Sequence, residues 1–326
     1  ASDVYKRQLI ILATSSTVWA TQEAAEQFKG AKMKIESLNF LEVVRHFESL
    51  PVAEIVRIYG AIGGVPAYLD KWDAAKSFKD NICRLVLTPS GALYGEADAV
   101  ISSELRELSA YSTILAAIAR GENKLNDIFH ATGFSRAKIS VYLKNLATFN
   151  IVEKVVSFET GGWENAKKGV YQIKDTFVNF WFKFVYPNMS NLYLLSPEEF
   201  YDTYIEKELD AYLERYFREV CTEYLLILNQ MGQLPFTIKR VGTWIGKTGR
   251  IDIVAQSEDR RSIIGFCNWD KPMMTMDMCE NMAMAMEQAR LTSDDYYLFS
   301  ATDFEPALQS YVVRDPRFKL INMNEL

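Results

Sequence analysis

The stretch Val241-Gly242-Thr243-Trp244-Ile245-Gly246-Lys247-Thr248-Gly249-Arg250-Ile251-Asp252-Ile253-Val254-Ala255 decides how the C-terminal part of the chain is interpreted. Its Gly246-Lys247-Thr248 run has the residue types of a phosphate-binding loop, but Val241 stands where the first glycine of that loop belongs. Such a loop must also open a helix, so that backbone amides meet the anion. Here the chain runs instead into the β-branched residues 251–254, which favour a strand. We therefore expect a β-strand and no nucleotide site.

Asp252 is a lone carboxylate inside this apolar strand, and a second strand is expected over residues 262–269 after a short turn. Alternate residues of a strand share a face, so Phe266 and Asn268 should point the same way. The arrangement resembles the PD-(D/E)XK nuclease-like core, in which an Asp on one strand and a Glu-x-Lys on the next surround a divalent metal. Asp252 matches the Asp, whereas Phe266 and Asn268 replace the Glu and the Lys. Because Mg²⁺ prefers carboxylate ligands, we expect the fold with a vestigial site and no metal.

A helix over residues 198–228 precedes these strands, and Glu219 matches the helix Glu of active nuclease-like domains. The resemblance thus implies Glu219 and Asp252 as the remaining catalytic positions. Glu214 and Glu223, on the same predicted helix, are alternative matches to the helix Glu. A methionine-rich helix and strands near 296–300 and 318–321 should complete the α/β restriction-endonuclease-like unit.

Composition sets limits on the function. The 326 residues are 49% hydrophobic and carry a net charge of −6, which argues against a basic coat for nucleic acid but allows a local patch. Four cysteines and two histidines lack metal-ligand spacing. No window has the roughly 18 uncharged apolar residues of a membrane span. We expect a cytoplasmic protein with reduced thiols and no membrane partner.

Residues 3–8 (Asp-Val-Tyr-Lys-Arg-Gln) resemble the translation of a sequencing-library adapter, so residues 1–8 are treated as a non-native scar and the natural protein as longer upstream. From Leu9 an apolar run ends in the polar residues Thr14, Ser15 and Ser16, a pattern typical of a buried parallel strand leading into a loop. Residues 63–69 then read Gly-Gly-Val-Pro-Ala-Tyr-Leu.

Together with the strand around Asp252, these segments resemble the archaeal-type ATPases of the AAA/STAND class. The resemblance implies that Thr14, Ser15 and Ser16 are the remnant of a nucleotide sensor and that residues up to Leu69 form a lid. In that class the phosphate loop lies further upstream, so ATP and Mg²⁺ are expected for the full-length parent, and neither ATPase activity nor a cofactor for this chain. A simple tight turn between helices is the alternative for residues 63–66.

A winged helix-turn-helix is predicted for the middle of the chain. A helix over 123–131, a turn at 132–135 and a helix over 136–149 capped by Ser135 are followed by strands near 150–156 and 169–173. Between residues 120 and 188 there are ten basic and six acidic side chains. The outward face of the second helix offers candidate nucleic-acid ligands: Arg136, Lys138, Ser140, Lys144 and Asn145. The centre of this face holds Ala137 and Val141, whose apolar side chains distinguish base pairs poorly. Docking of a protein partner therefore remains the alternative to binding of double-stranded DNA.

The sequence predicts a mostly helical α+β protein in successive parts. These are an ATPase remnant (9–75), a linker helix (76–99), the winged helix-turn-helix (100–188) and the degenerate nuclease-like unit (195–326). The expected role is the DNA- or partner-binding effector half of an ATP-dependent switch. An active Mg²⁺-dependent endonuclease and a structural interaction module are the alternatives.

Overall fold

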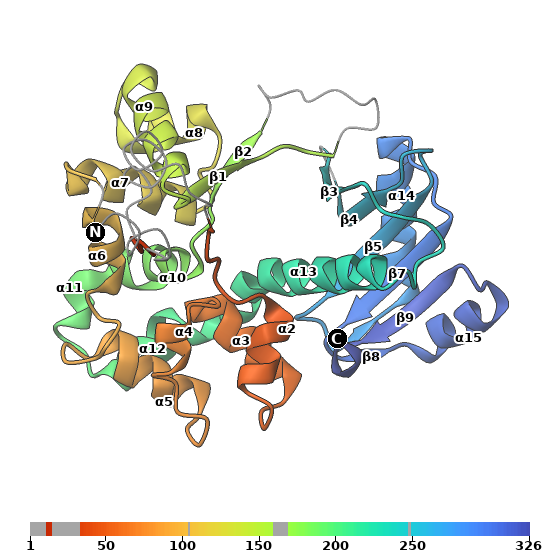
Figure 1. The fold of residues 1–326 in the computed structure, drawn as a ribbon, viewed down its shortest axis with the longest axis horizontal. Helices are drawn as coiled ribbons and strands as arrows, with labels where there is room; N and C mark the ends of the chain where they lie inside the picture. Colours follow the sequence, from red (N-terminus) through yellow and green to blue (C-terminus); the bar gives the residue numbers. More distant parts are fainter. Residues whose placement is uncertain (1–10, 15–32, 104, 159–168, 247–248) are drawn as a thin grey trace, which may run out of the picture.

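The computed structural model describes residues 11–14, 33–103, 105–158, 169–246 and 249–326 (Figure 1). The fold is mixed α+β, with helices in the first part and a five-stranded sheet in the C-terminal part. The first helices are α2 (Phe40–His46), α3 (Val52–Ile62), α4 (Pro66–Leu69), α5 (Phe78–Ile82), α6 (Glu96–Ser102), α7 (Leu108–Ala119), α8 (Leu125–Thr132), α9 (Arg136–Thr148), α10 (Thr176–Phe180), α11 (Met189–Leu192) and α12 (Pro197–Tyr204). Single π-helical or 3-10 turns are η3 (Cys83–Leu87), η4 (Trp181–Val185), η5 (Tyr186–Asn188) and η6 (Met323–Glu325).

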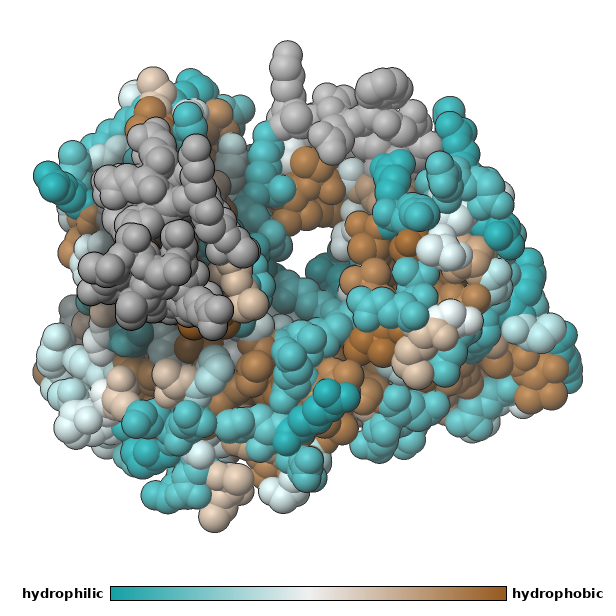
Figure 2. Space-filling model, viewed as in Figure 1, coloured by the Kyte–Doolittle hydropathy of each residue, from teal (hydrophilic) through white to brown (hydrophobic). Residues whose placement is uncertain are grey.

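The remaining elements include the longest helix, which joins the two parts. They are α13 (Glu206–Gln230), α14 (Met276–Ala289), α15 (Pro306–Arg314), β1 (Val152–Val155), β2 (Val170–Ile173), β3 (Arg240–Ile245), β4 (Arg250–Gln256), β5 (Ser262–Asn268), β6 (Met273–Met274), β7 (Asp295–Ser300), β8 (Asp303–Phe304) and β9 (Phe318–Asn322). In Figure 1, α13 runs from the helical part to the sheet, and the space-filling view in Figure 2 shows an opening between these two parts. No helix in the described ranges has both the length and the apolar character needed to cross a bilayer.

The Gly-Gly-Val-Pro string forms a turn between α3 and α4, and the backbone explains its composition. Gly63 ends α3 with φ at +68°, a conformation that glycine adopts without steric cost. A Cβ on Gly64 would lie 1.9 Å from the carbonyl oxygen of Leu38, and the Leu38 amide donates to the Gly64 carbonyl at 2.8 Å. Pro66 is the first residue of α4, where its missing N–H costs nothing. The tight turn is thus present between two helices.

Three helices and a hairpin follow one another in the order expected for the middle of the chain. The helices α7, α8 and α9 pack together, and β1 pairs antiparallel with β2 from Val152↔Ile173 to Val155↔Val170. Buried residues of α9 and β1 belong to one core, which also includes the aromatic run of α10 and η4. That run is at most 2% exposed at Phe177, Phe180, Trp181, Phe182 and Phe184, as expected for a core helix.

The C-terminal sheet has the order β3-β4-β5-β7-β9. The strands β3, β4 and β5 are antiparallel neighbours, and β5, β7 and β9 are parallel. Alternate residues enter different cores: Ile253, Ile263 and Phe299 face the core that includes α13, while Val254, Ile264 and Leu298 join residues of α14 and α15. The sheet is therefore the middle layer between α13 and the pair α14 and α15.

Several expected elements differ from the structure. Residues 11–14 are exposed and belong to no strand, with Ile11 79% exposed, because no strand among the described residues pairs with them. Leu9 and Ile10 lie outside the described residues. The start of the predicted winged helix-turn-helix segment, from residue 100, is divided between α6 and α7, since Glu107 at the start of α7 has φ at +31°. The helix expected over 198–228 is likewise divided into α12 and α13 at Ile205.

Candidate functional site

Asp252 lies at a β-bulge between β3 and β4. Gly242 pairs with Val254 and Trp244 with Ile251, so β4 has one more residue than β3 between these pairs. The Thr243 hydroxyl donates to the Asp252 carbonyl at 2.8 Å across the bulge. Bulges often redirect a side chain near functional sites, and this one accompanies a carboxylate that is only 5% exposed.

Two arginines and a backbone amide surround the Asp252 carboxylate. Its Oδ1 accepts from Arg218 Nε of α13 at 3.1 Å and from Arg250 Nε at 2.8 Å. Its Oδ2 accepts from the amide of Cys267 at 3.1 Å. Buried charges are stable when they are paired and hydrogen-bonded. The side chain that the sequence places as a vestigial metal ligand therefore has a complete set of protein partners.

Phe266 and Asn268 have structural surroundings of their own. Phe266 packs against the core between the sheet and α14. The Asn268 amide is 2% exposed and donates to Ser300 Oγ at 3.0 Å and to the Lys271 carbonyl at 3.2 Å. Asn268 thus joins β5 to β7 and to the following turn.

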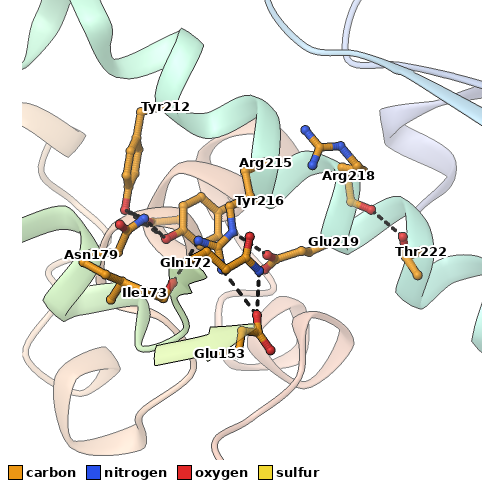
Figure 3. Close-up of polar contacts among 11 residues, drawn as sticks. Glu153, Gln172, Ile173, Asn179, Tyr212, Arg215, Tyr216, Arg218, Glu219 and Thr222 are labelled. Carbon is orange, nitrogen blue, oxygen red and sulfur yellow. Dashed lines mark hydrogen bonds and ion pairs between the residues drawn. The ribbon is translucent and has the colours of Figure 1, made fainter. Parts of the chain in front are cut away.

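The glutamates of α13 lie in different environments. Glu219 accepts from Arg215 Nε at 2.8 Å, and Arg215 also donates to the Ile173 carbonyl at 2.8 Å, so Glu219 belongs to the contact between α13 and the β1–β2 hairpin (Figure 3). Glu214 lies nearer the Asp252 cluster, with an oxygen 4.0 Å from an Arg250 nitrogen. Arg250 therefore links Glu214 to Asp252 by ion pairs, whereas Glu219 pairs with Arg215.

Glu223 has a different role, because its two oxygens accept the amides of Phe40 and Leu41 at 3.0 and 3.1 Å. These amides lie at the start of α2, where a carboxylate is favoured. Among the residues that the structure describes, no group of three or more His, Cys, Asp or Glu side chains could hold a metal ion. The proposed sensor residue Thr14 lies in the exposed segment 11–14, and Ser15 and Ser16 lie outside the described residues.

Helix α9 is the second candidate site, and local chemistry accounts for its start and its inner face. The Ser135 hydroxyl caps the helix by accepting the amide of Lys138 at 3.2 Å. The inner face buries Ile139, Tyr142, Leu143 and Leu146. The helix begins and ends within one residue of the sequence expectation.

The structure keeps three of the five predicted nucleic-acid ligands on the exposed surface: Arg136, Ser140 and Lys144. Arg136 is held in place because its guanidinium lies 4.2 Å from the ring centre of Phe129 and its Nε donates to Asn126 at 3.0 Å. The Ser140 hydroxyl donates to the Arg136 carbonyl.

The other two predicted ligands are partly buried. Lys138 lies over the ring of Phe134 at 4.4 Å, and Asn145 donates to the Tyr111 hydroxyl at 2.8 Å. Asn145 therefore joins α9 to α7. At the centre of the outer face, Val141 is 56% exposed.

Arg218 and Arg250 are site residues that sequence reasoning missed. Arg250 had a signal, because it lies two residues before Asp252 on the same strand. Arg218 had none, since its contact with Asp252 spans 34 residues of sequence.

Comparison with known proteins gives relatives without an assigned activity. Residues 181–282 match the family DUF234, described as archaea bacterial proteins of unknown function. The chain is 29% identical over 304 residues to the uncharacterized protein MJECL04 of Methanocaldococcus jannaschii. The aligned region covers 91% of this chain and 67% of that relative. No solved structure matches the chain. The family match includes the Asp252 cluster and excludes α9.

Proposed function

We propose that this chain binds double-stranded DNA through α9 and acts as the DNA-engaging effector part of a longer, ATP-dependent switch protein. One observation carries the proposal. The 13 residues of α9 include Arg136, Lys138 and Lys144 and no acidic residue, although the chain as a whole has a net charge of −6. Its outer face is exposed, so a basic helix is available on an acidic protein.

The geometry of α9 suits the major groove, which is about 12 Å wide and admits one helix. Arg136 and Lys138 lie in the first turn, next to the helix N-terminus, where a phosphate is also favoured by the helix dipole. Arg136 is already ordered by Phe129 and Asn126, so less side-chain freedom is lost on binding. Lys144, two turns later, would meet a phosphate further along the groove.

Sequence discrimination by this surface should be weak. The centre of the outer face carries Ala137 and the 56% exposed Val141, which offer only apolar contact to a thymine methyl group. Most of the binding free energy would therefore come from phosphate contacts, which weaken as salt rises.

The C-terminal unit serves this function as a scaffold that does not cleave DNA. The PD-(D/E)XK-like order of helix and strands supports that fold, and Asp252 is neutralised by Arg218 and Arg250. A divalent ion would have to displace both guanidinium groups, which weighs against the endonuclease alternative. ATP dependence is proposed from the resemblance of residues 63–66 (Gly-Gly-Val-Pro) to the AAA/STAND ATPases. ATP would bind to the full-length parent and not to this chain.

Fluorescence anisotropy with a labelled duplex of about two helical turns, about 20 base pairs, tests DNA binding at low salt. The triple variant Arg136→Glu, Lys138→Glu, Lys144→Glu should abolish binding. A control variant with the same charge change, Lys207→Glu, Lys239→Glu, Arg314→Glu, places it on exposed positions of the C-terminal unit. It should retain most of the affinity. Equal losses in the two variants would show that net charge, and not α9, determines binding; no binding by the wild type would favour the protein-docking alternative.

A further inference from the structure

Cys221 of α13 and Cys267 of β5 lie in one core, where the long helix packs against the sheet. Cys221 is buried there, and Cys267 is partly buried against the same group of side chains. Beside them, the ring of Phe217 lies 5.4 Å from that of Trp269. Phe217 is four residues before Cys221, and Trp269 is two residues after Cys267, so each ring lies on the same side of its segment as the neighbouring cysteine. This contact brings the two cysteines toward each other.

A second ring contact lies on the other side of the pair. Tyr224, three residues after Cys221, has its ring 5.9 Å from that of Phe299. Phe299 is the β7 residue that pairs with Cys267 in the parallel register. Residues 217, 221 and 224 share one face of α13. Cys221 is therefore held between two rings that contact neighbours of Cys267.

The Asp252 carboxylate fixes the same contact through the backbone. Its Oδ1 accepts from Arg218 Nε and its Oδ2 accepts from the Cys267 amide, each at 3.1 Å. Arg218 is three residues before Cys221, on the adjacent turn of α13. One carboxylate thus joins the helix next to Cys221 to the strand at Cys267.

The two cysteines are free thiols that differ in exposure and in proton affinity. Cys221 is fully buried, and this burial, together with a hydrogen bond with the Cys267 side chain, raises the pKa of the Cys221 thiol well above its ordinary value. Cys267 is partly exposed. Because the reactive form of cysteine is the thiolate and access is required, an oxidant should reach Cys267 first. Cys221 is placed to react with the oxidised Cys267.

We propose that Cys221 and Cys267 are a modification site, at which hydrogen peroxide forms a reversible disulfide between α13 and β5. The Cys267 thiolate attacks one peroxide oxygen, so that an S–O bond forms, the O–O bond breaks and the other oxygen takes up a proton and leaves as water. The Cys221 sulfur then attacks the Cys267 sulfur, forming the S–S bond and breaking the S–O bond, and a second water leaves. Two thiols are oxidised by two electrons and one peroxide is reduced to two waters.

The disulfide would fasten the helix that joins the two parts of the molecule to the sheet. It would close the long loop between positions 221 and 267, and such a cross-link stabilises the folded chain by restricting the unfolded one. We expect a rise in Tm of roughly 5 °C on oxidation. The proposal goes beyond DNA binding and does not depend on it.

Peptide mapping of the full chain tests the proposal. The reduced protein is treated with one equivalent of hydrogen peroxide, remaining thiols are alkylated, and the digest is analysed by mass spectrometry. A peptide that links Cys221 to Cys267 should appear, about 2 Da lighter than the sum of the two reduced peptides. Dithiothreitol should remove it and reverse the rise in Tm. This readout on the wild type does not depend on the folding of any variant.

Two variants separate this pair from the other cysteines. Cys83→Ala with Cys279→Ala is the control, which retains the pair and should form the linked peptide as the wild type does. Cys221→Ala should leave Cys267 as a sulfenic acid that dimedone traps, with no rise in Tm on oxidation. Cys267 oxidised to the sulfinic acid without a linked peptide, disulfides between different molecules only, or no reaction of either thiol would each overturn the proposal.

Discussion

Replacing Asp252 by Ala tests whether this carboxylate is a structural partner of the arginines. The substitution leaves Arg218, whose side chain is 17% exposed, without its counter-charge and removes the acceptor of the Cys267 amide. It also frees Arg250, which is 44% exposed and can be solvated. The cost should therefore come mainly from Arg218 and the amide.

The expected magnitude follows from these exposures. An exposed ion pair contributes about 0–1 kcal/mol, so the loss of the Arg250 pair is a small part. Breaking a buried pair by removing one partner costs about 3–5 kcal/mol. Because Arg218 retains some contact with water, we expect about 3 kcal/mol, or a fall in Tm of roughly 6 °C for a chain of this size.

Urea denaturation followed by tryptophan fluorescence measures this loss. The double variant Arg218→Met, Asp252→Leu is the control, because an apolar pair of similar volume often replaces a buried ion pair at little cost. It should be closer to the wild type than Asp252→Ala is. A loss of less than about 1 kcal/mol in Asp252→Ala, within the range of an exposed pair, would refute the structural role.

Three further outcomes follow from the contacts described. Glu223→Gln should lower the free energy of unfolding by about 1 kcal/mol, because it removes the charge at the start of α2; equal denaturation midpoints would contradict this. Burial raises the pKa of the carboxyl of Asp175, the N-cap of α10, so the contribution of this group to stability should fall as the pH rises above about 4. Asp175→Asn should therefore be more stable than the wild type at pH 7, and the difference should vanish below about pH 4. Thermal melts at both pH values decide this. Neither Mg²⁺ nor Mn²⁺ should elicit cleavage of supercoiled DNA, and nicking that Asp252→Ala removes would show that the site is active.

The parts of the fold that sequence could predict are those with strong local patterns. The β-branched run 251–254 indicated β4 to within two residues, and the strand expected over 262–269 matches β5 to within one. Ser135 and the leucine spacing placed α9 equally well. The strand β3 had no such pattern because glycine interrupts it at Gly242, and it forms through pairing with β4.

Several tertiary contacts of this fold were not visible in the sequence, because they join distant segments. Arg218 reaches Asp252 from a helix 34 residues away, and Ser157 meets Ile245 across 88 residues. Local periodicity carries no information about either. The positive φ of Glu107, which separates α6 from α7, is similarly a result of packing that no propensity indicates.

The salt dependence of duplex binding tests the central claim, that α9 meets DNA through phosphate contacts, most directly. The logarithm of the association constant should fall linearly with the logarithm of salt concentration, by about 0.9 per phosphate neutralised. Lys144→Ala should reduce that slope by about one and weaken binding similarly for different sequences. A slope that is the same in the wild type and in Lys144→Ala, or an affinity that does not change with salt, would contradict the claim.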